Sequence, residues 1–145
     1  MKPFPLEKVL EVRRHTRQER RNALGAAIAD EQTLLEMRQQ TEQQKNALLD
    51  ELTNLSQSGT LNVEAAARRR YFAGQLEIQL LVIDQQIIEA RQAIDAARAA
   101  LVKADQDVKA LERLREQHID EEAYLENRRS ENALAEQWQS ANWNW

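Results

Sequence analysis

Two histidines are the residues of this 145-residue sequence best suited to metal binding or proton transfer. His15 and His118 lie far apart in the sequence, so only a fold that returns the chain on itself could bring them together. If the chain folds back near its middle, His15 faces residue 103, and about 20 Å of helix separates it from His118. We therefore expect no shared metal ion or proton relay, and we expect His118 to be a half-buried packing residue.

A run of acidic residues follows the second histidine and invites the same question. Asp120, Glu121 and Glu122 are the residue types used for general acid and base catalysis. Such catalysis needs a concave pocket, which two long helices do not form. The three glycines lie far apart and make no phosphate-binding loop, and there is no cysteine for a disulfide or a thiolate metal site. The sequence predicts no catalytic activity and no cofactor.

Apolar residues in the second half of the chain recur in two series with a seven-residue step. The first series is Ala73, Leu80, Ile87, Ile94, Leu101 and Val108, and the second is Leu76, Ile83, Ala90, Ala97, Ala104 and Leu111. Two such series, three residues apart, are the a and d positions of a coiled coil. The stripe is narrow, so it can cover one partner helix but cannot enclose a globular core. We expect the first-series residues Leu80, Ile87, Ile94 and Leu101 to be the best buried.

The composition is typical of long helices rather than of a many-stranded fold. Hydrophobic residues make up 42% of the chain, aromatic residues only 5%, and there are 3 Gly and 2 Pro. A net charge of −4 excludes a general nucleic-acid binder. The densest apolar run, IQLLVI, is too short to span a membrane, and the first ten residues lack the apolar core of a secretory signal. We expect a soluble protein.

One strong break divides the chain, at residues 53–66. Serine and glycine interrupt the helical pattern there, and Asn62 or Thr60 can cap a new helix with Glu64 in its first turn. The sequence thus predicts a single-domain, all-α, antiparallel two-helix coiled-coil hairpin. Helix one covers about residues 5–55, the turn 56–62, helix two 63–138, and a flexible tail 139–145.

Three segments depart from a regular hairpin. Between Glu36 and Asn46 the chain is nearly all polar, which predicts a weak middle where the helices splay or bend. Helix two is longer than helix one, so it should lack a partner helix from about Gln117 onward. The tail with Trp138, Trp143 and Trp145 is either disordered or a docking peptide, and we expect disorder in the free protein.

Two clusters are candidates for partner binding. Arg13, Arg17 and Arg20 share one helix face, which is suited to an anionic membrane surface, to an acidic protein partner, or simply to solvent. Tyr71 and Phe72 are adjacent aromatic residues close to the turn. They either cover the end of the hairpin core or leave an exposed anchor for a partner.

The sequence resembles the flagellar protein-export stalk family of the FliJ type over nearly its whole length. The resemblance rests on the opening FPLEKVLEVRR, on the segment SGTLNVEAAARRRYFAGQLEIQ and on KALERLREQH, with the spacing of Phe4, Leu6, Val9 and Leu10 as its most distinctive part. Members of that family are antiparallel coiled coils similar in shape to the central stalk of rotary ATPases.

The resemblance implies a non-enzymatic component of flagellar export that works with several partners. It inserts into the hexameric export ATPase ring and contacts the cytoplasmic domain of the export gate, with export chaperones as further candidate partners. It also implies a cytoplasmic location with peripheral membrane contact. The alternatives are an injectisome secretion stalk, a generic coiled-coil scaffold, and a membrane-surface adaptor.

Site residues follow from the resemblance together with the clusters above. For the gate, Phe72 and Leu76 match the family on helix two. On helix one Gln44, Leu48 and Leu55 match by position, whereas Glu51 stands where the family has an aromatic residue. We add Tyr71 to the gate set because it adjoins Phe72, and we assign Arg13, Arg17 and Arg20 to the ATPase ring.

Overall fold

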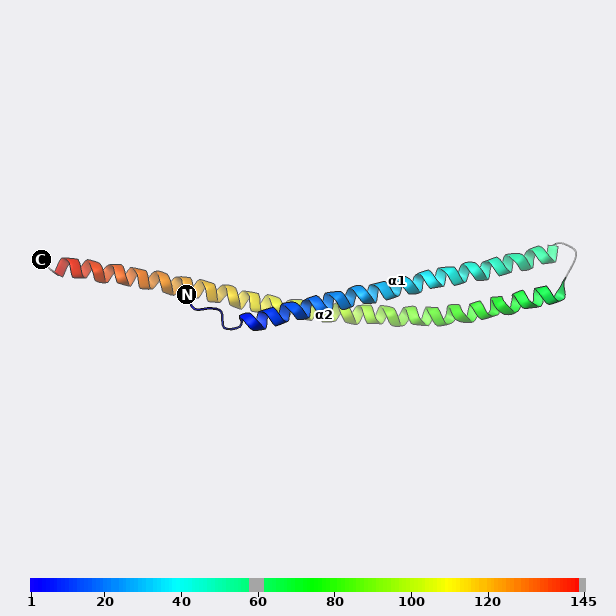
Figure 1. Ribbon diagram of the computed structural model, residues 1–145, viewed down its shortest axis with the longest axis horizontal. Coiled ribbons are helices and arrows are strands. Elements are labelled where there is room, and N and C mark those ends of the chain that lie inside the picture. The colour runs from blue at the N-terminus through cyan, green and yellow to red at the C-terminus, as the bar shows by residue number, and fades with distance from the viewer. Residues whose placement is uncertain (58–61, 144–145) are drawn as a thin grey trace. The chain divides into compact units, whose positions relative to one another are not determined.

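Two helices make up nearly all of the computed structural model, which describes residues 1–57 and 62–143. The first helix, α1, spans Glu7–Gln57, and the second, α2, spans Val63–Trp143 (Figure 1). The two helices pack against each other, and the described residues contain no strand. This confirms the all-α prediction. By its contacts the chain divides into unit 1, made of Met1–Arg21 and Ala100–Trp145, and unit 2, made of Asn22–Ala99.

Local signals in the sequence account for where the helices begin. The Leu10 N–H donates to the Leu6 carbonyl at 2.9 Å, which closes the first turn of α1. The side chain of Asn62 accepts a hydrogen bond from the Ala65 N–H at 3.3 Å, so Asn62 is the cap of α2. Residues 58–61 of the expected turn lie outside the described part of the chain. α2 begins where the sequence predicted, and α1 begins and ends two residues later than expected.

The predicted end of helix two is wrong. The sequence analysis placed it near residue 138, with a flexible tail after it, but α2 continues to Trp143. No glycine or proline follows Gly74 in the sequence. Residues 132–142 include three Ala, two Gln, one Leu and one Glu, which favour helix, so nothing stops the helix earlier. The Trp138 side chain is exposed, and residues 144–145 lie outside the described range.

Among the described residues of unit 2, the buried side chains all come from α2. They are Ala73, Leu80, Ile83, Ile87 and Ile94. α1 contributes half-buried side chains at alternating steps of three and four residues, which is the coiled-coil spacing. These are Leu24, Ala27, Glu31, Leu34, Arg38, Thr41, Lys45, Leu48, Leu52 and Leu55. The α2 stripe in this unit therefore faces α1 as predicted.

The weak middle predicted for residues 36–46 is wrong in this unit. α1 is unbroken there, and the half-buried positions are occupied by Arg38, Thr41 and Lys45 in place of apolar residues. Long charged side chains cover apolar surface with their methylene stems while their charged ends stay in water. The sequence argument counted only apolar residues, so it missed this continuation of the packing surface.

In unit 1 both helices contribute fully covered residues. Leu10 from α1 and Val108 from α2 have no exposed surface, and Ala104 is also buried. Leu101, expected among the best-buried residues, is only half-buried. The residue opposite Leu101 in the antiparallel register is Arg21, which is exposed and does not cover it.

The segment before α1 in unit 1 lies against α2. The Lys2 main-chain N donates to the Glu122 carboxylate at 3.3 Å, and the Lys2 carbonyl lies 2.9 Å from His118 Nε2. The Phe4 ring lies 5.8 Å from the His118 ring. The N-terminal segment thus covers α2 at His118 and Glu122, and Glu122 is buried. Residues 124–142 are exposed and have no partner helix among the described residues, as predicted. The half-buried position predicted for His118 is confirmed.

Candidate partner-binding site

A ladder of ion pairs aligns the two helices of unit 2. Glu31 pairs with Arg91 at 3.2 Å, Arg38 with Asp84 at 2.6 Å and Lys45 with Glu77 at 3.8 Å. Each step of seven residues forward on α1 is a step of seven back on α2, so the helices run antiparallel. The hydrogen bond from Arg38 to Asp84 and the charge of Asp84 raise the pKa of the Arg38 guanidinium.

The order of charges in this ladder disfavours a slip of the register by one heptad in one direction. In that slip Glu31 faces Asp84 and Lys45 faces Arg70, so like charges lie opposite each other at two of the three positions, which is unfavourable. In the other direction Arg38 faces Arg91, but Lys45 then faces Asp84, so the ladder discriminates less against that slip. Exposed ion pairs stabilise a fold little, so we infer that the ladder's main effect is to fix which residues face each other. No apolar pattern in the sequence signals it; only the charges at seven-residue spacing could have revealed it.

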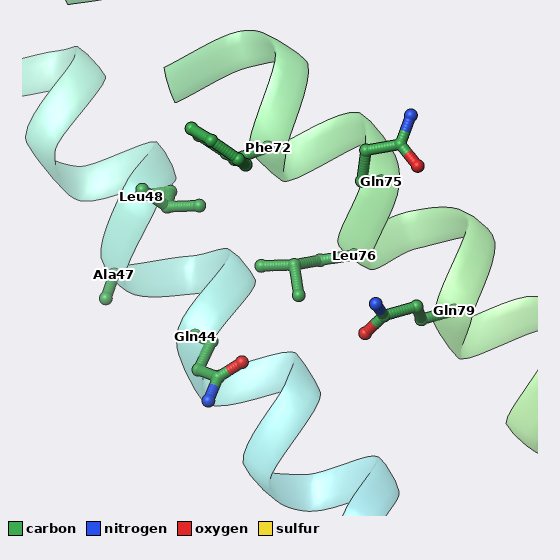
Figure 2. Close-up of a pocket in the computed structure, with 7 residues that line it drawn as sticks. All are labelled: Gln44, Ala47, Leu48, Phe72, Gln75, Leu76 and Gln79. Atoms are coloured by element: carbon green, nitrogen blue, oxygen red, sulfur yellow. The ribbon is translucent and has the colours of Figure 1, made fainter. Parts of the chain in front are cut away.

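With the helices in this register, an open groove of about 430 Å³ forms near the start of α2. Its lining residues are Gln44, Ala47, Leu48, Phe72, Gln75, Leu76 and Gln79. Figure 2 shows Leu48 of α1 and Phe72 and Leu76 of α2 pointing toward one another between the helices. Phe72 is 54% exposed, which leaves much of its ring available to a partner. The groove is apolar at its centre and bordered by amides.

The structure brings together four of the six residues predicted for the gate, counting Gln44. Leu48, Phe72 and Leu76 line the groove with Gln44. Leu55 is half-buried and Tyr71 is exposed, and neither lines it. The Tyr71 ring instead meets the edge of Phe72 with ring centres 5.8 Å apart.

Glu51, which departs from the family pattern, has a local role in unit 2. Its carboxylate accepts a hydrogen bond from Arg69 at 2.7 Å. A carboxylate at this position therefore ties α1 to the first turns of α2. In this pair the anion is on α1, as it is for Glu31, whereas Arg38 and Lys45 place the cation on α1.

The arginines predicted for the ATPase ring do not form a single free face in unit 1. Arg17 is half-buried and pairs with Asp105 at 3.1 Å. Arg13 and Arg20 are exposed, and they line an open groove of about 400 Å³ with Lys103 and other residues. The accessible cationic set is therefore Arg13, Arg20 and Lys103, with Arg17 acting within the fold.

The carboxylate of Asp105 pairs with two cations of unit 1, Arg17 and Lys109. A hydrogen bond from Lys109 is the main reason that the pKa of Asp105 lies below its ordinary value; desolvation opposes this shift, and a hydrogen bond from Arg17 adds to it. The Lys109 ammonium lies 2.9 Å from this carboxylate. Asp105 thus holds Arg17 in place against α2.

Neither histidine belongs to a metal site in the described part of the chain. His15 lies 3.0 Å from the Glu19 carboxylate and is largely exposed, whereas His118 contacts the N-terminal segment. No cluster of three or more metal-ligating side chains occurs among residues 1–57 and 62–143. Within the same residues, neither helix contains a stretch apolar enough to cross a membrane.

Comparison with known proteins supports the family expected from the sequence. The model of the family described as Flagellar FliJ protein matches residues 1–142, nearly the entire chain. The chain belongs to this family. It is therefore a flagellar export-related protein. No curated protein and no solved structure matches it significantly.

Proposed function

We propose that the chain is a non-enzymatic stalk of the flagellar export apparatus. In this proposal it inserts into the hexameric export ATPase ring and contacts the cytoplasmic domain of the export gate at the inner face of the membrane. The observation that carries the proposal is the family match over residues 1–142. That match also favours flagellar export over an injectisome stalk or a generic scaffold, and export chaperones remain candidate partners.

The groove of unit 2 supports contact with the gate. It offers an apolar centre made by Leu48, Phe72 and Leu76 with an amide border. A partly exposed aromatic ring at the centre of an apolar patch is a common source of binding energy in protein interfaces. The ion-pair ladder holds the two sides of the groove in one register, so the partner meets a preorganised surface.

The cationic groove of unit 1 supports contact with the ATPase ring. Arg13, Arg20 and Lys103 surround it with one nearby carboxylate, Asp107. Exposed charges of this kind form weak ion pairs that break and form readily. A stalk whose contacts change while the ring turns over nucleotide requires such contacts.

The direct experiment measures ATP hydrolysis by the cognate hexameric ATPase with and without the chain. We expect the chain to raise turnover and to promote ring assembly while hydrolysing no ATP alone. An identical steady-state rate at saturating chain concentration would remove the main support for the stalk role.

Two sets of variants separate the two contacts. Phe72→Ala and Leu76→Ala should weaken gate binding, by about 2 kcal/mol for a hot-spot residue, and leave ATPase stimulation intact. Arg13→Glu with Arg20→Glu should reduce stimulation and spare the gate; Arg17 is avoided because it pairs with Asp105. Val102→Ala is the control for the groove set, because Val102 is 56% exposed and lines neither groove. If both sets weaken the same partner, the two-surface assignment is wrong.

A further inference from the structure

A second apolar surface of unit 2 lies on α2 away from the packing stripe. It occupies the b, c and f positions of the coiled-coil repeat, which point away from α1. We call it the outer strip; its apolar and small residues are Tyr71, Gly74, Ile78, Leu81, Val82 and Ile88. The intervening outer positions are Gln75 and Gln85, so the strip carries no charge in a chain whose residues are 30% charged.

Every residue of the outer strip is exposed. Leu81 is 67% exposed and Ile78 56%, although large aliphatic side chains usually avoid water in such numbers on one face. The seam explains none of them, because α1 lies on the other side of α2. Except for Tyr71, which touches Phe72, and Gln75, which borders the groove, the strip has no role in the surfaces described above.

Gly74 in this strip also lacks an explanation within its own chain. A glycine inside a helix is less stable than alanine by about 0.5–1 kcal/mol. A Cβ built on Gly74 would meet nothing within 4 Å, so no neighbouring atom requires the glycine. A shallow position on an exposed apolar face is what a second helix needs for close approach.

Opposite charges mark the two ends of the outer strip. Arg68 precedes it and Glu89 follows it, both exposed on the same outer face. Neither forms an ion pair with a described residue of its own chain. Arg68 lies ten residues before Ile78 and Glu89 eleven residues after it, so the two charges are almost symmetric about Ile78.

We propose that the outer strip binds the same strip of a second copy of this chain, in an antiparallel pair centred on Ile78. This arrangement places Arg68 of each copy within about one residue rise, 1.5 Å along the axis, of Glu89 of the other. It also lays Val82 over Gly74, and it brings Gln85 level with Tyr71. A parallel pair would instead place Arg68 against Arg68. An isologous contact of this kind closes at two copies.

The size of the strip determines how strong this association is. From Tyr71 to Ile88 the strip is about 27 Å long at 1.5 Å per residue, and its width is that of one helix, about 10–12 Å. A face of these dimensions buries less than the roughly 800 Å² per partner of a standard stable interface. The pair is therefore weak, and its population depends on protein concentration.

The first test is analytical ultracentrifugation of the full chain from about 1 µM to about 500 µM, a range that spans weak association. We expect a reversible monomer–dimer equilibrium. Leu81→Glu should weaken it by about tenfold or more, as for a central contact residue. Val102→Glu is the control, since Val102 is 56% exposed at the equivalent repeat position outside the strip. A monomer at all concentrations, or a dimer unaffected by Leu81→Glu, overturns the proposal.

Charge reversal tests the antiparallel orientation. Arg68→Glu and Glu89→Arg should each weaken the dimer, because each leaves like charges facing across both ends. The double variant with both changes should restore it. Restoration cannot arise from a partner of another kind, and a double variant weaker than either single one contradicts the arrangement.

A cross-link locates the centre of the pair. Because the chain has no cysteine, Ile78→Cys introduces a single thiol at the proposed two-fold axis. Mild oxidation should join two copies of Ile78→Cys, and it should leave Val102→Cys largely monomeric. Equal cross-linking of both variants would show random collision. If the chain stays monomeric and Leu81→Glu instead reduces its binding to anionic phospholipid vesicles, the strip faces lipid and the proposal is wrong.

Discussion

The two units of the molecule bury their apolar residues in different ways. In unit 1, Leu10 and Val108 are fully covered, one from each helix. In the described part of unit 2 the buried side chains belong to α2, and the α1 side of the seam includes Glu31, Arg38 and Lys45 at half-buried positions. The same helix, α1, thus supplies an apolar packing residue in one unit and charged covering residues in the other.

This difference shows that the residues that stabilise the fold are not the same as those that fix which residues of the two helices face each other. A fully buried leucine stabilises packing but accepts many alternative apolar neighbours, so it specifies the alignment poorly. Charged residues of both signs contribute little stability at the surface but penalise every misalignment that places like charges together. In unit 2 the partner-binding groove depends on alignment, because Leu48 and Leu76 come from different helices.

The largest effect is expected from emptying the fully covered cluster of unit 1. Leu10→Ala should lower the free energy of unfolding by about 2–5 kcal/mol, because it leaves a cavity at a position with no exposed surface. Leu24→Ala in unit 2 should be milder, since Leu24 is only half-buried. Urea denaturation followed by circular dichroism measures both. Leu134→Ala is the control, because the Leu134 side chain is 65% exposed. If Leu10→Ala and Leu24→Ala lower the free energy of unfolding equally, the two units do not differ as described.

A smaller effect is expected from reversing one charge of the ladder. Arg38→Glu places a carboxylate beside Asp84 and Glu42, where Arg38 now binds both. The melting temperature should fall, but less than for Leu10→Ala, because these groups remain in contact with water.

The reciprocal change provides the control for this prediction. Adding Asp84→Arg to Arg38→Glu should recover most of the lost melting temperature, since the pair is rebuilt with its signs exchanged. Arg38→Leu should also keep the melting temperature near that of the original chain, because an apolar side chain fits the seam. If Arg38→Glu unfolds at the same temperature as the original chain, the ladder does not constrain the helices.

Much of the fold was predictable because it depends on local patterns. The seven-residue spacing from Ala73 to Ile94 predicted the α2 side of the seam, and Asn62 was one of two caps proposed for α2. The polar middle of α1 was misinterpreted because hydrophobicity does not record that the stems of Arg38 and Lys45 cover apolar surface.

The candidate site was predictable only in part, for a related reason. Phe72 and Leu76 could be identified along one helix, whereas their meeting with Leu48 depends on a register set by pairs between distant residues. Arg17 was predicted to bind the ATPase ring, but it pairs with α2 instead. Helical spacing shows which residues share a face of one helix, but it does not show which residues of the other helix that face contacts. The partner of Arg17, Asp105, is 88 residues away in the sequence.

The smallest effect concerns Asp105, which holds one arginine of unit 1 in place. Its pKa in the folded chain lies below the ordinary value of 3.8, first because of the hydrogen bond from Lys109 and then because of Arg17. A carboxylate of this kind stabilises the fold fully above its unfolded pKa, and the stabilisation is lost as the pH falls through the folded pKa. Asp105→Asn should therefore melt below the original chain at pH 7, and this difference should shrink as the pH is lowered past 3.8. Lys109→Ala should reduce the pH-dependent change in melting temperature more than Arg17→Ala does, since the hydrogen bond from Lys109 lowers the pKa of Asp105 more than the one from Arg17. Thermal melts of the three variants at neutral and acidic pH test this order, and a difference that grows in acid would reverse the assigned sign.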